Sequence, residues 1–223
     1  SSDLLDTTTG AYSVWLDGSD VGLGSFRIDA LARLDDGDLL LSLTAAGSVG
    51  GLDFDDSDII RFTPSSLGVD SAGSFSMYFD GSDVGMTTNG EDTDGLAILD
   101  DGTLLLSTRG TCRVTGATAR DEDIFAFSPS SLGDYTAGTF ALWFDGSDVG
   151  LSTSSSEDLD AISLAPDGSM VSLSTLGSFA VTGLSGNDED LFDFEPSSLG
   201  GSTAGSFSAY FNGLENGLEA NDD

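Results

Sequence analysis

The stretch from Trp15 to Leu23, which reads Trp-Leu-Asp-Gly-Ser-Asp-Val-Gly-Leu, decides the fold because the chain repeats it. It returns from Tyr78 to Met86 and from Trp143 to Leu151, and a diverged copy runs from Tyr210 to Leu218. Successive copies start 63, 65 and 67 residues apart. A fixed period of this kind predicts a repeat architecture, in which each unit buries its core against its neighbours.

A second block keeps the same period and helps to set the unit boundaries. Pro-Ser-Ser-Leu-Gly begins at Pro64 and Pro129, and a third copy begins at Pro196. The two blocks together predict a single repeat domain over residues 1–223. Its parts are an N-terminal strand at 11–18, units at 26–80, 92–145 and 158–212, and a C-terminal tail at 213–223.

Each unit shows the pattern of four short β-strands. In the middle unit we expect strands at 95–99, 103–108, 123–128 and 139–145. The first two flank Asp100-Asp101-Gly102, a hairpin turn signal, a long loop leads to the third, and Pro129 is expected to end that third strand. No segment shows the apolar period of an α-helix, about 3.6 residues. The predicted fold class is therefore all-β.

Four consecutive strands per unit resemble a blade of the β-propellers found in secreted bacterial and archaeal repeat proteins. The resemblance covers nearly the whole chain and implies three blades plus an extra N-terminal strand. Another β-repeat or a sandwich array is the alternative. Because closed propellers have about 4–8 blades, three blades imply exposed sheet edges. Either the sequence is an excerpt of a longer array, or other chains complete the structure, by donation of the N-terminal strand or in a closed oligomer.

The charge balance excludes many functions. Asp and Glu number 39 against six Arg, which gives a net charge of −33, and the chain has no Lys or His. Nucleic acids and anionic membranes are poor partners for such a surface, because both are bound through cationic side chains. The absence of His removes His-dependent catalysis, and one Cys excludes an internal disulfide. No apolar stretch reaches the length of a membrane span, so no membrane insertion is expected.

Asp outnumbers Glu by 32 to 7, and much of this Asp recurs in loops that should share one face of the units. Crowded carboxylates repel one another unless a cation neutralises them. Calcium accepts about 6–8 oxygen ligands in irregular Asp- and Gly-rich loops, so we predict Ca²⁺ sites there. The candidate ligands are Asp17, Asp20, Asp80, Asp83, Asp92, Asp94, Asp121, Asp123, Asp145, Asp148, Asp158, Asp160, Asp188 and Asp190.

Two other interpretations of these aspartates stay open. Asp-Gly and Gly-Ser-Asp are ordinary turn formers, and their carboxylates often bind loop amides. An acidic surface without Lys is also typical of adaptation to high salt, where screening acts without specific sites.

The functional hypothesis is a non-enzymatic extracellular protein, stabilised by calcium, that assembles with itself as a filament, matrix, surface-layer or adhesion component. A marine or saline setting fits its charge, and glycans are a further candidate partner. The alternative is a carbohydrate-binding or hydrolytic propeller that uses paired carboxylates. Because the acidic loop recurs in every unit whereas a catalytic site should be unique, no catalytic residue and no organic cofactor is predicted.

Overall fold

The computed structural model describes residues 2–6, 13–152 and 154–218. Three four-stranded antiparallel sheets correspond to the three units and confirm the all-β prediction. The first sheet contains β3 (Ile28–Arg33), β4 (Leu39–Leu43), β7 (Ile59–Ser66) and β8 (Ala72–Phe79). The second contains β9 (Thr93–Ile98), β10 (Leu104–Thr108), β13 (Ile124–Ser131) and β14 (Ala137–Phe144). The third contains β15 (Leu159–Leu164), β16 (Val171–Thr175), β19 (Leu191–Ser198) and β20 (Ala204–Phe211).

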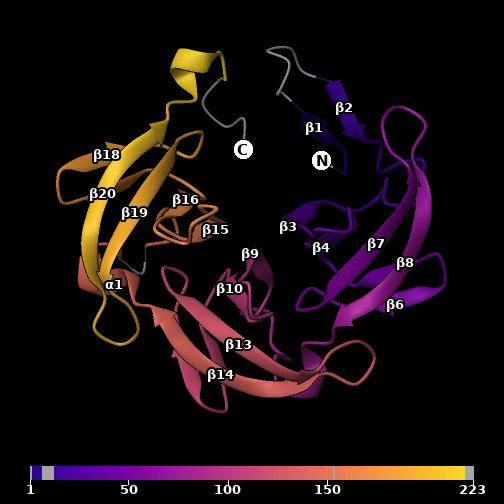
Figure 1. Cartoon of the computed structure of the whole chain (residues 1–223), viewed down its shortest axis with the longest axis horizontal. Coiled ribbons are helices and arrows are strands. Elements are labelled where there is room, and N and C mark those ends of the chain that lie inside the picture. Colours follow the sequence, from indigo (N-terminus) through magenta and orange to yellow (C-terminus); the bar gives the residue numbers. More distant parts are fainter. Residues whose placement is uncertain (1, 7–12, 153, 219–223) are drawn as a thin grey trace.

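The three sheets stand around a common centre, in a propeller-like arrangement (Figure 1). Strands β3, β9 and β15 lie innermost, and β8, β14 and β20 lie outermost. Each sheet therefore follows the chain from the centre outward. The arrangement is open on one side, between β20 and the N-terminal strands (Figure 1).

A two-stranded hairpin interrupts the expected long loop between the second and third strands of each unit. These hairpins are β5 (Gly47–Val49) with β6 (Leu52–Phe54), β11 (Cys112–Val114) with β12 (Ala117–Ala119), and β17 (Phe179–Val181) with β18 (Leu184–Gly186). They cover the sheet with apolar side chains, as Phe179 does where its ring lies 4.2 Å from that of Phe192. The buried thiol of Cys112 belongs to this layer, and its burial raises its pKa to about 12.

The N-terminal strand predicted at 11–18 has a partner that the sequence did not predict. β1 (Leu4–Asp6) pairs antiparallel with β2 (Ser13–Leu16), while residues 11 and 12 lie outside the described residues. Leu4 pairs with Leu16 next to a register shift, just as Ile59 pairs with Phe79 at the start of β7 and β8. β1 and β2 therefore reproduce the third and fourth strands of a unit, and we call them the N-terminal half-unit.

The prediction that Pro129 ends its strand was wrong, because β13 continues to Ser131. β10 pairs with β13 only up to Phe127, so beyond that point the strand has β14 as its one neighbour. The register also shifts between Pro129 and Ser131. A proline is tolerated at a bulge of this kind because its missing N–H is not needed there.

The core is continuous from one unit to the next. Phe79, the last residue of β8, is fully buried, and its ring meets that of Phe127 in the second unit at 5.1 Å, edge to face. Phe144 makes the same contact with Phe194 in the third unit, also at 5.1 Å. Each unit therefore completes the apolar core of its neighbour, as the repeat period predicts.

A short helix follows the last strand of every complete unit. These are η1 (Ser82–Val84), α1 (Gly146–Val149) and η2 (Leu214–Asn216). In the part of the chain that the structure describes, no helix has the length and apolar character needed to cross a membrane.

Candidate functional site

The Asp-Gly-Ser-Asp motif fastens each unit to the next. The backbone N–H of Asp80 donates to Oγ1 of Thr136 at 2.9 Å, and the N–H of Thr136 donates to Oδ2 of Asp83 at 2.9 Å. The N–H of Gly133 donates to the carbonyl of Tyr78 at 2.8 Å. We call this set of hydrogen bonds the inter-unit clamp.

The clamp occurs at three junctions with the same atoms. Ser71 takes the place of Thr136 between the N-terminal half-unit and the first unit, where it binds Asp17 and Asp20. Thr203 takes the place of Thr136 between the second and third units, where Thr203 binds Asp145 and Asp148. The clamp aspartates were predicted as calcium ligands. That role stays a prediction, and the structure gives them a second role in joining units.

Removing the clamp hydroxyl without changing its size should weaken the junction. Thr136→Val loses the bond from Asp80 and the bond that this hydroxyl donates to Gly133. We expect it to lower the free energy of unfolding by about 1–2 kcal/mol in urea titrations followed by circular dichroism. The exposed Thr139→Val is the matched control and should change it by less than about 0.5 kcal/mol. Equal losses would show that the clamp hydroxyl contributes nothing specific.

A second set of carboxylates holds the loop that leads out of the fourth strand. Oδ1 of Asp123 accepts the N–H of Gly146 at 2.9 Å, and Asp190 accepts that of Gly213 at 3.0 Å. Asp58 does the same for Gly81 in the first unit. Burial raises the pKa of Asp123, and it raises that of Asp58 to about 7.

A third set of aspartates gathers where the inner strands meet. Asp29, Asp94 and Asp160 occupy one repeat position on β3, β9 and β15, and Asp92 and Asp158 come just before the last two of these strands. We call these five residues the axial carboxylate cluster. The three strands surround the centre of the molecule in Figure 1. All three units therefore contribute to the cluster.

Hydrogen bonds within the axial carboxylate cluster differ between the units. Ser107 donates to Asp94 at 2.9 Å, and Ser174 donates to Asp160 at 2.5 Å. Their counterpart Ser42 has no hydrogen-bond partner among the described residues, whereas Asp29 shares a hydrogen bond with Asp92.

The axial carboxylate cluster holds more negative charge than its surroundings neutralise. Asp92 and Asp158 are 4% and 2% exposed, and Oδ1 of each lacks a hydrogen-bond partner among the described residues. Burial, followed by repulsion from Asp29, raises the pKa of Asp92 to about 7. Burial, followed by repulsion from Asp121, raises the pKa of Asp158 to about 8. Arg109 offsets part of both effects. Asp92 and Asp158 therefore hold their protons to a higher pH than an ordinary aspartate does.

Two buried glutamates add to the charge at the junctions. Both carboxylate oxygens of Glu122 and of Glu189 lack a hydrogen-bond partner among the described residues. Glu122 is fully buried, with a guanidinium nitrogen of Arg120 at 3.9 Å, and burial raises its pKa to about 7.

The structure brings together four predicted ligands, Asp92, Asp94, Asp158 and Asp160, and adds Asp29 to them. Asp121 lies near this group, and Asp188 occupies the same repeat position as Asp121. Sequence reasoning missed Asp29, although its alignment with Asp94 and Asp160 in the repeat would have found it. It also missed Glu122 and Glu189, because burial of a loop carboxylate leaves no sequence signal.

Among the described residues, no group of three or more Asp, Glu or Cys side chains is arranged to hold a metal ion. The axial carboxylate cluster nevertheless has the donors that suit calcium, since Asp92 and Asp158 each keep one buried oxygen without a partner. A cation would require neighbouring carboxylates to rotate toward these two oxygens. The clamp aspartates, in contrast, already bind backbone amides.

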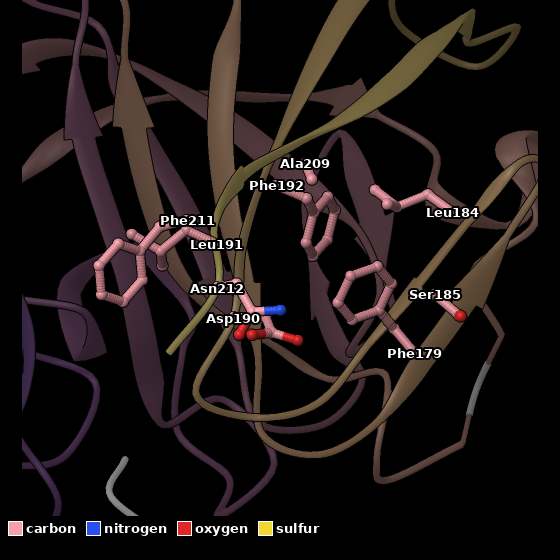
Figure 2. A pocket seen from close by; sticks show the side chains of 9 residues that line it. All are labelled: Phe179, Leu184, Ser185, Asp190, Leu191, Phe192, Ala209, Phe211 and Asn212. Carbon is pink, nitrogen blue, oxygen red and sulfur yellow. The ribbon is translucent and has the colours of Figure 1, made fainter. Parts of the chain in front are cut away.

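A small pocket lies in the third unit, between the β17–β18 hairpin and strands β19 and β20 (Figure 2). It exists because Ala209 stands where the other units have Met77 and Leu142 opposite the third strand. Its volume is about 60 Å³, which is room for water and not for a sugar ring. Its lining is Phe179, Leu184, Ser185, Asp190, Leu191, Phe192, Ala209, Phe211 and Asn212.

Comparison with protein-family models, with curated proteins and with solved structures found no match to this chain. The repeated four-stranded sheets place it in the class of β-repeat proteins.

Proposed function

We propose that this protein is a non-enzymatic, extracellular β-repeat protein, stabilised by calcium, that associates with itself as a building block of a filament, matrix, surface layer or adhesive structure. The observation that carries the proposal is the axial carboxylate cluster. It contains buried carboxylates with raised pKa values and unpartnered oxygens, contributed by all three units. A cation at this point would join the units and not only order one loop.

Calcium is the cation that the chemistry favours. The donors are carboxylates with no His, and calcium tolerates irregular oxygen cages better than magnesium does. Extracellular calcium modules work at dissociation constants of about 0.1–1 mM, so weak sites suffice outside the cell. Repetition of the clamp from unit to unit supports a scaffold over an active site, because a catalytic site should be unique.

Calcium should raise the melting temperature of the chelated protein. At a hundredfold excess over its dissociation constant, one site adds about 2.7 kcal/mol. For a chain of this length that corresponds to a rise of about 5–10 °C. Differential scanning calorimetry in EDTA and then in excess calcium measures it directly.

Sodium chloride at matched ionic strength separates specific binding from charge screening. A rise in melting temperature that sodium reproduces in full would support salt adaptation instead of a calcium site. An unchanged melting temperature in calcium at low salt would contradict the proposal.

A further inference from the structure

The N-terminal half-unit exposes a position that all complete units bury. Leu5 pairs with Val14 immediately after the register shift, at the place that Ile60, Phe125 and Phe192 hold in the complete units. Those three side chains are at most 1% exposed, whereas Leu5 is 57% exposed. The complete units have two elements here that the half-unit lacks among the described residues: a second strand that pairs with the third, and a two-stranded hairpin that packs over it, as Phe179 packs on Phe192.

In the complete units the second strand pairs with the third at this very position. Leu41 pairs with Ile60, Leu106 with Phe125, and Leu173 with Phe192. Beside β1 no described residue takes the place of these leucines, since β1 and β2 form a two-stranded sheet. Among the described residues, the half-unit therefore has no counterpart of the two inner strands of a unit.

The other side of the opening in Figure 1 also lacks its partner. Phe211 at the end of β20 is half-buried, and the neighbouring Tyr210 is 64% exposed, whereas Phe79 and Phe144 are buried against the following unit. The loop after β20 nevertheless keeps a hydrogen bond that holds the matching loop in the other units. The N–H of Gly213 donates to Asp190, as that of Gly81 donates to Asp58.

We infer that the free edge of β1, beside this opening, accepts a two-stranded antiparallel β-hairpin from another polypeptide chain. Its outer strand would pair with β1 and cover Leu5, and its inner strand would take the place that β3, β9 and β15 take in the complete units. The hairpin that fits is one of this repeat's own type, with a strand such as Leu104–Thr108 joined by a tight Asp-Gly turn. The inference rests on the proposed self-association only for the source of the hairpin, and it does not depend on calcium.

A synthetic peptide of residues 92–109, which spans β9 and β10, tests the inference on the full chain. We expect saturable binding by isothermal titration calorimetry and slower hydrogen exchange in β1. Because both molecules are acidic, the titration is run in about 0.15 M NaCl to screen their repulsion. A scrambled peptide of the same composition should not bind. Absence of saturable binding by the native peptide would overturn the inference.

Two matched variants locate the contact. Leu5→Asp places a charge where the hairpin must pack and should weaken peptide binding at least about tenfold. Tyr135→Asp, at a site that is 84% exposed in the turn between β13 and β14, should leave binding unchanged. Because both side chains are exposed, neither change should unfold the protein. Binding that survives Leu5→Asp would also overturn the inference. Light scattering of the protein alone reports separately on self-association.

Discussion

Replacing Asp92 and Asp158 together by Asn should raise the melting temperature of the calcium-free protein at pH above 8 by about 6–12 °C. The change removes two buried negative charges whose carboxylates have raised pKa values and incomplete hydrogen bonding. One pKa unit corresponds to about 1.4 kcal/mol. Because the two sites share neighbours, their effects are not additive, and we count about one unit for each, which gives a gain of about 3 kcal/mol for the pair. The same variant should lose its stabilisation by calcium.

The pH dependence of the unmodified protein follows from the same carboxylates. A carboxyl whose pKa is raised on folding binds its proton more tightly in the native state, so its stabilising contribution is complete below its unfolded pKa, about 3.9. That contribution is lost as the pH rises through the folded values, about 7 for Asp92 and about 8 for Asp158. In EDTA and low salt, stability should therefore fall between mildly acidic and mildly alkaline pH. In the Asn variant this slope should be much smaller.

The control for this variant is Asp70→Asn with Asp134→Asn. Both residues are exposed, in the turns between the third and fourth strands of the first two units, and the change removes the same number of charges. Thermal melts at several pH values compare the two double variants with the parent. If the control raised the melting temperature equally, general charge repulsion would explain the effect, and the axial carboxylate cluster would have no special role.

Much of the fold could be predicted because a repeat shows its boundaries directly. The turn at Asp100-Asp101-Gly102 forms as expected, with Gly102 at a φ of 85°. The short hairpins were not predicted because their strands have only three residues each. So few residues show no clear alternation of apolar and polar side chains. β1 escaped it because the paired positions Leu4 and Leu16 are 12 residues apart, whereas the matching Ile59 and Phe79 are 20 apart, which displaces β1 from the repeat period.

The candidate site was predictable only in part. The sequence pattern indicated that carboxylates such as Asp92 and Asp158 lie close together, because they recur before the equivalent strand of successive units. It did not predict that Asp83 binds Thr136, since an ordinary threonine 53 residues away gives no local signal. Clamp partners are set by how one unit packs on the next, and this is long-range information that spacing within a unit does not contain.

The second large effect concerns the buried phenylalanine at a unit junction. Phe144 is 1% exposed and packs edge to face against Phe194 of the third unit. Phe144→Ala should therefore lower the free energy of unfolding by about 3–5 kcal/mol, through lost burial and the cavity left behind. Because this side chain connects the second and third units, we also expect the urea transition to broaden as the third unit unfolds separately.

Phe211→Ala is the matched control, because Phe211 holds the same repeat position on β20 but is only half-buried. It should cost less than about 1 kcal/mol, since no described unit follows it to bury the ring. Circular dichroism follows all strands in these titrations, while tryptophan fluorescence reports on Trp15 in β2 and Trp143 in β14, both outside the third unit. For Phe144→Ala the two signals should separate, and for Phe211→Ala they should coincide. Equal losses in the two variants would mean that the ring's place at a junction does not stabilise the protein, and that successive units are held together by the clamp alone.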